Sequence, residues 1–271
     1  MIYQKVMARR YLTVNVSEEQ QEFIQLLGDH EVDIFSIKTI EKQIQKRFSN
    51  LNAILENLVD KRFLSRIENG KYCRINFRDE LVIGTFLAKE AVIAYWTALN
   101  KHGLTEQFSN TIFIQTPYLK HEKKVFGIPY KFVKILRSKR VGIVQQGYGN
   151  RMYEMTNVEK TIVDCFDLPE YSGGYAELLR AFNQATLDPT KLIEYCKAVG
   201  NKAATKRIGF LAEILKPEQL KSFIDFAREE VNKKYNLFDP AGQEEGEFVN
   251  AWRLRLNISR VDILNIVNKQ Y

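Results

Sequence analysis

The stretch EAVIAYWTALNKHGLTEQFSNTIFIQT, residues 90–116, lies near the middle of the chain and joins two kinds of secondary structure. Small and apolar residues recur there at helical spacing, which predicts a helix over residues 91–102. They are Ala91, Ala94, Tyr95, Ala98 and Leu99. Gly103 stands where a left-handed residue would end that helix, and Leu104 can fold back on its last turn. Residues 111–116 are rich in β-formers and stop at a proline, so a buried helix is expected to lead directly into a strand.

Composition describes an ordinary folded protein with an excess of positive charge. Hydrophobic residues make up 45% of the chain and charged residues 27%, and the length of 271 residues predicts two domains. The net charge is +7 at pH 7 and the pI is about 9.1. This balance favours a polyanionic partner, either nucleic acid or an anionic membrane surface.

The sequence shows no signal for membrane insertion, export or disulfide bonding. No apolar run approaches the ~18 residues that a membrane span requires, and the N-terminal MIYQKVMARRYL lacks the continuous apolar segment of a signal peptide. Cys73, Cys165 and Cys196 are odd in number and widely spaced, which fits buried thiols better than disulfides or a zinc site. We therefore expect a cytoplasmic protein with no membrane partner and no bound metal.

Residues 17–76 have the element order of a winged helix-turn-helix. Three short stretches with helical apolar spacing each follow a serine that can cap the helix. These serines are Ser17, Ser36 and Ser49. Two β-rich runs then flank Asn69-Gly70, a dipeptide typical of a tight hairpin turn.

The chain is therefore expected to be an α+β protein with two domains. Residues 1–78 would form the winged helix-turn-helix DNA-binding domain, and residues 79–271 a larger mixed α/β domain. Lys5, Arg9 and Arg10 form a small basic cluster near the N-terminus, which fits either an arm that touches phosphate or a solvated lead-in.

In a winged helix the third helix enters the major groove, and its first turns face the bases. In this sequence those turns contain Ser49, Asn50 and Asn52, and an asparagine can form paired hydrogen bonds with adenine. Cations before the helix and on the wing are the expected phosphate contacts. They are Lys46, Arg47, Arg66, Lys71 and Arg74.

The charge of residues 1–76 argues against DNA binding. Residues 1–76 contain twelve lysines and arginines against ten acidic residues, so the net charge of the segment is small. Glu56 and Asp60 on the third helix would also repel phosphate. Winged helices serve as protein-binding modules as well, and both interpretations stay open.

A second basic stretch lies in the larger domain. Between Gln115 and Arg140 there are eight lysines and arginines and one acid, Glu122, interleaved with aromatic residues. The pattern fits a second nucleic-acid surface, and it fits equally well alternating strands with aromatics inward and lysines in water. Its cations are Lys120, Lys123, Lys124, Lys131, Lys134, Arg137, Lys139 and Arg140.

A secondary candidate for anion binding lies on a predicted helix over residues 201–215. Lys202, Lys206 and Arg207 fall within two turns of one another, and the two lysines are four residues apart on one face. Like charges at that spacing mildly destabilise a helix unless an anion binds them. A solvated helix edge is the alternative.

No sequence motif for catalysis, a cofactor or a metal is present. We find no nucleotide-binding glycine loop, no zinc-protease helix, no paired CxxC and no nucleophile elbow. Glu159 and Asp164 diverge by about 140° on a helix, which favours a helix cap and a solvent or core-edge acid over a carboxylate pair. We expect no enzymatic activity and no cofactor.

Four stretches of this chain together resemble the AbiEi family of antitoxins from type IV toxin–antitoxin systems. They are AYWTALNKHGLTEQ (94–107), NVEKTIVDC (157–165), ATKRIGFLAEIL (204–215) and LFDPAGQEEGEFVNAWRLRLN (237–257), in the order found in that family. With the N-terminal winged-helix segment, the resemblance covers almost the whole chain. The partner toxins resemble nucleotidyltransferases with a Gly-Ser turn and paired aspartates, which Gly173-Gly174 lacks, so the chain is similar to the antitoxin.

The resemblance implies a repressor of its own operon that binds inverted repeats in double-stranded operator DNA and counteracts a nucleotidyltransferase-like toxin. Its third helix is poorer in lysine and arginine than such a role leads one to expect. The alternative is an interaction module that does not bind DNA and whose basic second domain binds an acidic protein partner such as the toxin.

Overall fold

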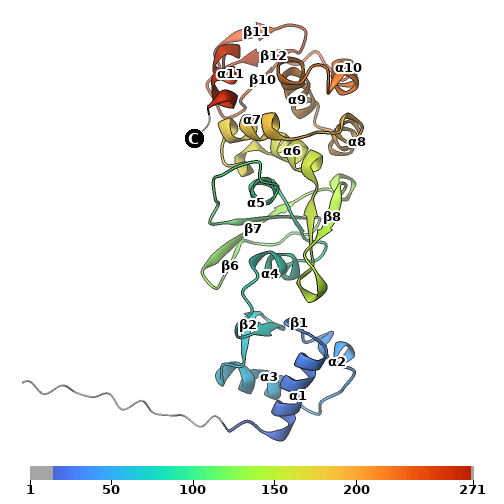
Figure 1. Cartoon of the computed structure of the whole chain (residues 1–271), viewed down its shortest axis with the longest axis vertical. Helices are drawn as coiled ribbons and strands as arrows, with labels where there is room; N and C mark the ends of the chain where they lie inside the picture. The colour runs from blue at the N-terminus through green and yellow to red at the C-terminus, as the bar shows by residue number, and fades with distance from the viewer. Residues whose placement is uncertain (1–14, 270–271) are drawn as a thin grey trace, which may run out of the picture. The chain divides into compact units, whose positions relative to one another are not determined.

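The computed structural model describes residues 15–269, so Lys5, Arg9 and Arg10 lie outside the described part of the chain. The chain divides into two compact units, Met1–Arg78 (unit 1) and Asp79–Tyr271 (unit 2), drawn in Figure 1. The division falls at residue 78, where the sequence places the domain boundary. Both units combine helices with small sheets, which confirms the α+β class.

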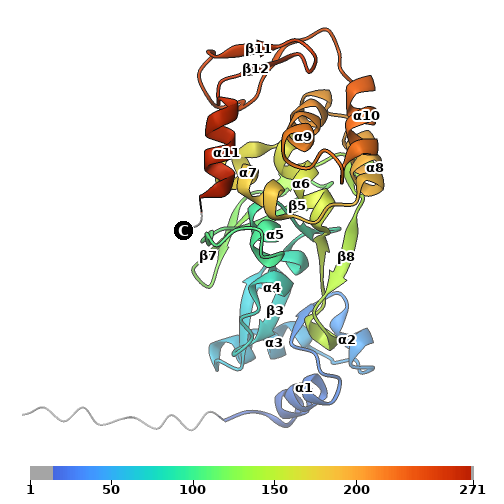
Figure 2. The same ribbon diagram turned by 45° about the horizontal axis from the view of Figure 1, so that its top comes forward.

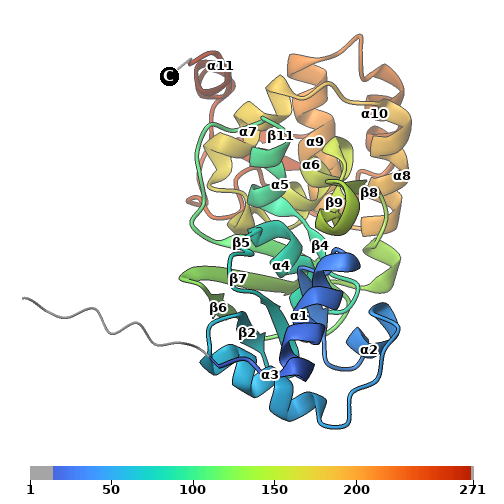
Figure 3. The same cartoon turned by 60° about the horizontal axis from the view of Figure 1, so that its bottom comes forward.

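Unit 1 is a winged helix-turn-helix. Its elements are α1 (Glu18–Asp29), β1 (Ile34–Ser36), α2 (Ile40–Gln43), α3 (Leu51–Asp60), β2 (Leu64–Glu68) and β3 (Lys71–Arg74). The three strands form an antiparallel sheet in the order β1-β3-β2, with Asn69-Gly70 at the hairpin turn. Figure 3 shows the three helices of this unit.

Aromatic packing joins the helices of unit 1 to its sheet. Phe23 of α1 is fully buried and meets Phe35 of β1 and Phe48 edge to face, with ring centroids 5.9 and 5.4 Å apart. Phe35 in turn stacks on Tyr72 of β3 at 5.9 Å. This chain of rings fixes α1 against two of the three strands.

Of the three predicted capping serines, only Ser17 caps a helix. Its side chain accepts a hydrogen bond from the Gln20 backbone amide, and the Ser17 amide donates in turn to Gln20 Oε1 at 3.2 Å. Ser36 is instead the last residue of β1, a three-residue strand that the sequence analysis did not anticipate. Asn50, not Ser49, is the N-cap of α3, with Oδ1 accepting from the Ala53 amide at 3.2 Å.

Unit 2 is built on a six-stranded mixed sheet in the order β6-β7-β5-β4-β9-β8. The strands are β4 (Val92–Ile93), β5 (Ile112–Thr116), β6 (Lys123–Val125), β7 (Ile128–Lys134), β8 (Ile143–Gln146) and β9 (Tyr153–Thr156). Pairs β5/β7 and β4/β9 are parallel, and the others are antiparallel. Helix α4 (Glu80–Leu87) covers one face and α5 (Tyr95–Lys101) the other, with α6 (Val158–Asp167) packed against α5 (Figure 1).

The central stretch departs from its predicted helix at the N-terminal side. Val92 and Ile93 form β4, because they pair with β5 on one side and with β9 on the other. Helix α5 begins only at Tyr95, whose φ of +55° is unusual for a bulky side chain. The end follows the prediction: Gly103 has φ +70°, and the Leu104 amide donates back to the last turn at 2.9 Å.

A layer of helices and a small second sheet complete unit 2 (Figure 2). The helices are α7 (Tyr175–Gln184), α8 (Pro189–Val199), α9 (Lys202–Leu215), α10 (Lys221–Glu229) and α11 (Arg260–Asn268). The small sheet has the order β10-β12-β11, made of β10 (Asn236–Leu237), β11 (Glu247–Val249) and β12 (Leu254–Leu256). Within residues 15–269, no helix is both long and apolar enough to cross a membrane.

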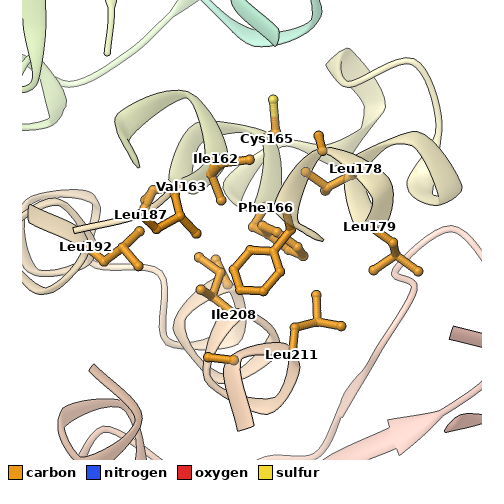
Figure 4. Close-up of a cluster of buried hydrophobic side chains, with 14 of the residues drawn as sticks. Ile162, Val163, Cys165, Phe166, Leu178, Leu179, Leu187, Leu192, Ile208 and Leu211 are labelled. Atoms are coloured by element: carbon orange, nitrogen blue, oxygen red, sulfur yellow. The ribbon is translucent and has the colours of Figure 1, made fainter. Parts of the chain in front are cut away.

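The core of unit 2 lies where α6, α7 and α9 meet (Figure 4). Phe166 of α6 is fully buried there, between Leu178 of α7 and Ile208 and Leu211 of α9. Burying a side chain of this size contributes about 1.5–3 kcal/mol relative to leaving it in water. The buried charged residues Lys160, Asp164, Lys206 and Arg207 lie on two of these helices, α6 and α9.

Candidate nucleic-acid interface

The N-terminal end of α3 is the part of unit 1 that a winged helix presents to the bases. Arg47, Ser49 and Asn52 are exposed at this end. None of these three side chains makes a hydrogen bond or an ion pair with any residue in the described range 15–269. Their hydrogen-bonding groups are therefore available to a ligand.

Asn50 is placed differently from the neighbouring Asn52. Its Oδ1 accepts the Ala53 amide and so holds the first turn of α3 together. A paired hydrogen bond to adenine needs both the oxygen and the nitrogen of the amide. Of the two asparagines predicted to read bases, the geometry therefore leaves that role open to Asn52 and gives Asn50 a capping role.

Four of the five predicted phosphate contacts are engaged in ion pairs within unit 1. Lys46 pairs with Glu22 and Arg66 with Glu56, while Lys71 lies 3.1 Å from Glu68 and Arg74 lies 3.9 Å from Asp33. Arg66 also lies over the Tyr72 ring, 5.6 Å from its centroid. Pairs that reach the surface contribute roughly 0–1 kcal/mol, so phosphate could displace these carboxylates at small cost.

Two exposed lysines beside α2 were not anticipated by the sequence analysis. Lys38 precedes α2 and Lys42 lies within it, and both side chains point into solvent. In a helix-turn-helix the helix before the reading helix crosses the DNA backbone. Their place just before the turn into α3 was the signal that could have identified them as phosphate contacts.

The strand cations of the second basic stretch are divided between the two faces of the six-stranded sheet. Side chains alternate along a strand, so Lys131 and Lys134 of β7 point to opposite faces, as do Lys123 and Lys124 of β6. Lys120 lies over the Phe132 ring, 5.9 Å from its centroid. The stretch is therefore not one continuous basic surface.

The last three cations of this stretch are each anchored by a carboxylate of unit 2. Arg137 donates to both oxygens of Glu90, at 3.1 and 2.9 Å. Lys139 donates to Asp167 at 2.7 Å, and Arg140 pairs with Glu154. These contacts hold the loop after β7 against the sheet and α6, and they offset three of the seven excess positive charges of the stretch.

The secondary site on α9 is not a surface. Lys202 is exposed and lies 3.6 Å from Glu230, whereas Lys206 is fully buried. The Lys206 ammonium donates to the Lys234 carbonyl at 2.7 Å, and burial lowers its pKa to about 8. Arg207 is buried too, with Nε donating to the Leu237 carbonyl at 3.0 Å. The expectation of a shared basic face is wrong, because α9 is covered by other elements along most of its length.

Helix α6 contains a buried ion pair that the sequence analysis missed. Lys160 and Asp164, one turn apart, are both withdrawn from solvent and paired. Burial raises the pKa of the Asp164 carboxyl to about 6, although Lys160 opposes the shift. Asp164 is thus not the solvent or core-edge acid that was expected, and its Oδ2 has no hydrogen-bond partner within residues 15–269.

Glu159 is also buried, and it does not pair with Asp164. Its carboxylate accepts the Asp188 backbone amide at 3.1 Å, at the start of α8. The cap of α6 is Asn157, which accepts the Lys160 amide at 2.9 Å. Among the described residues, no group of three or more histidines, cysteines or acids is placed to hold a metal ion.

Comparison with known proteins identifies a relative in fold. No family model and no curated protein matches this chain. Among solved structures, the crystal structure of the RV2827C protein from Mycobacterium tuberculosis is similar, with a TM-score of 0.65 and 13% sequence identity. The match covers 94% of this chain and 96% of that chain. At this identity the likeness concerns the fold alone, and it extends over both units.

Proposed function

We propose that this protein is a DNA-binding antitoxin that represses its own operon and counteracts a nucleotidyltransferase-like toxin. The observation that supports DNA recognition most directly is the exposed N-terminal end of α3. The side chains of Arg47, Ser49 and Asn52 make no hydrogen bond or ion pair within residues 15–269. The resemblance of four stretches to AbiEi-family antitoxins supports the toxin-related half. Unit 1 would read operator DNA, and unit 2 would antagonise the toxin.

In this proposal α3 lies in the major groove of double-stranded DNA. Asn52 forms paired hydrogen bonds with an adenine, and Ser49 donates to or accepts from a neighbouring base. Lys38, Lys42 and Arg47 bind phosphates on either side of the groove. The cations now paired with carboxylates add to these contacts when phosphate replaces their partners.

Because unit 1 carries little net positive charge, we propose that specific binding depends on two copies of the protein on one operator. The resemblance to AbiEi-family repressors implies an operator with inverted repeats, so two copies would double the number of phosphate contacts. We further propose that the protein acts by binding and not by catalysis, without a cofactor, and in the cytoplasm.

Binding of the whole protein to the DNA upstream of its own gene tests the repressor role. Anisotropy titrations would compare that DNA with a shuffled duplex of the same composition, each at two salt concentrations. We expect preference for the upstream DNA and a steep loss of affinity with salt. Equal affinity for both duplexes, or no binding, would contradict the repressor role.

The toxin-related half needs a separate readout. Cells would express a neighbouring nucleotidyltransferase-like gene together with the wild-type protein or with Asn52→Ala. We expect both to restore growth, while only the wild type represses a reporter behind the upstream DNA. A growth defect that the wild-type protein does not relieve would contradict the antitoxin role.

A second candidate function is a protein-interaction module. The ion pairs of Lys46, Arg66, Lys71 and Arg74, together with Glu56 on α3, weaken the positive potential that DNA binding requires. In this case unit 1 would be structural and unit 2 would bind an acidic partner such as the toxin. Growth rescue with retention of the toxin on the purified protein, in the absence of DNA binding, would favour this alternative.

A further inference from the structure

The hairpin of β8 and β9 exposes an unbroken run of residues at its tip. All eight residues from Gln145 to Met152 are exposed, and Tyr148 presents 75% of its surface to solvent. The hairpin lies at the edge of the six-stranded sheet, because β8 pairs with β9 alone (Figure 1).

The side chains at this tip are of types that often contact nucleic acid in other proteins. Between Val141 and Tyr153 the sequence contains glutamine, asparagine, arginine and tyrosine but no acidic residue. A second exposed run in unit 2, residues 240–248, shows the opposite chemistry with three glutamates. Exposure alone therefore does not explain the composition of the hairpin tip.

The tip is a defined turn that holds these side chains in place. Gly147 has φ +85°, and a Cβ atom there would overlap the Arg151 carbonyl oxygen, so only glycine fits. The Arg151 amide donates to the Tyr148 carbonyl at 2.9 Å, which closes the turn. Below it, Gln146 pairs with Tyr153 in a regular antiparallel register.

Two acidic side chains lie near the base of the hairpin. Asp79 caps α4 by accepting the Leu81 and Val82 amides, and its charge adds to burial in raising the pKa of Tyr153. Glu154 is the acidic residue of β9, and Arg140 pairs with it. Arg151 is the one charged residue between Val141 and Tyr153, and its sign is positive. An exposed aromatic ring beside an arginine supplies both apolar contact and charge to a polyanion.

From these observations we propose that the β8–β9 hairpin inserts into a groove of duplex DNA as a second reading element, in addition to α3. A two-stranded β-ribbon fits the major groove, and glutamine, asparagine and arginine are side chains that recognise base edges there. Tyr148 and Arg151 contact the backbone or the base edges at the tip. This inference rests on the proposed DNA-binding function and extends it to unit 2.

Two variants of the full-length protein test the hairpin. The first is the double substitution Tyr148→Ala and Arg151→Ala. The matched control is Phe108→Ala and Lys221→Ala, which removes an equally exposed aromatic ring and a cation elsewhere in unit 2. Thermal melts followed by tryptophan fluorescence confirm that both variants fold like the wild type.

We expect the hairpin variant to bind the upstream DNA at least tenfold more weakly and the control to stay within twofold of the wild type. The slope of log affinity against log salt should fall by about one unit in the hairpin variant, because one phosphate contact is lost. A photo-crosslinking amino acid placed at position 148 should label the upstream duplex. The same group placed at position 108 should not.

The outcomes separate this inference from the proposed function. If the wild type prefers the upstream DNA but the hairpin variant binds equally well and position 148 does not crosslink, only the hairpin inference is overturned. If the wild type binds no DNA, both are overturned. Binding without sequence preference, combined with crosslinking at position 148, would support the hairpin contact and contradict the repressor role.

Discussion

Arg66 on the wing of unit 1 pairs with Glu56 on the helix that would face the bases. The pair ties the two DNA-facing parts of a winged helix to each other, and it removes one positive charge from the wing. Both side chains are about half exposed, so their attraction is screened by water. A phosphate close to Arg66 therefore competes with Glu56 on nearly equal terms.

Replacing Glu56 with glutamine should strengthen binding to all DNA. The change frees Arg66 for phosphate and removes a repelling carboxylate, and we expect a gain of roughly 0.5–1 kcal/mol, or about two- to fivefold in affinity. Anisotropy titrations on upstream and shuffled duplexes measure it. Asp60→Asn, which removes the same charge from the other end of α3, is the control and should have a smaller effect; equal gains would point to net charge alone.

The two asparagines of α3 should behave differently when replaced. Asn52→Ala should relax the preference for upstream DNA by ~1–3 kcal/mol, because a paired base contact is lost. Asn50→Ala should instead lower the unfolding free energy of unit 1 by about 0.5–2 kcal/mol through loss of the cap. Asn50→Asp keeps an oxygen at the cap and should retain the stability. Circular dichroism melts and DNA titrations of the three variants provide the measurements, and a loss of preference in Asn50→Asp alone would reverse the assignment.

Replacing one partner of the buried Lys160–Asp164 pair should destabilise unit 2 more than replacing both partners. Lys160→Met leaves a buried carboxylate without its partner, so we expect the unfolding free energy of unit 2 to fall by about 3–5 kcal/mol. Lys160→Met combined with Asp164→Leu should recover most of that loss, because two apolar side chains of similar volume need no partner. Both tryptophans of the chain, Trp96 and Trp252, lie in unit 2, so their fluorescence during urea unfolding reports on this unit.

The exposed pair of Lys202 and Glu230 serves as the control for this comparison. Lys202→Ala should change the unfolding free energy by less than about 1 kcal/mol. A double α6 variant as unstable as the single one would show that the two charges are individually required and would contradict the prediction.

Asp164 should also give unit 2 a measurable pH dependence. Its pKa is about 6 in the folded chain, above the ordinary value of 3.8, so the folded state binds a proton that the unfolded state has released between these pH values. The contribution of this group to stability is therefore complete below about pH 4 and is lost as the pH rises through 6. The stability difference between wild type and Asp164→Asn should change across that window by at most ~1.4 kcal/mol per pH unit. A constant difference between pH 4 and 7 would show that the carboxyl does not titrate there.

Local sequence signals correctly predicted the helix ends and turns that depend only on residues nearby in the sequence. Ser17 and Gln20 form the capping box of α1, Asn69-Gly70 turns the wing, and Gly103 ends α5, because each depends on backbone geometry that neighbouring residues dictate. The wrong assignments came where distant pairing decides. Val92 and Ile93 became a strand because β5 and β9 lie on either side of them, and an apolar run carries no mark of such partners.

The sequence by itself determined the winged-helix order, the α+β class and the position of the boundary between the two units. Only the tertiary structure decided which charged side chains meet solvent. The spacing of Lys206 and Arg207 on α9 predicts an exposed basic edge. In the structure both side chains are buried and donate hydrogen bonds to the backbone carbonyls of residues 234 and 237. Lysine and aspartate usually lie at the surface, whereas Lys160 and Asp164 are buried as a pair. A charge enters the core when the fold brings a partner to it, and that partner is often far away in the sequence.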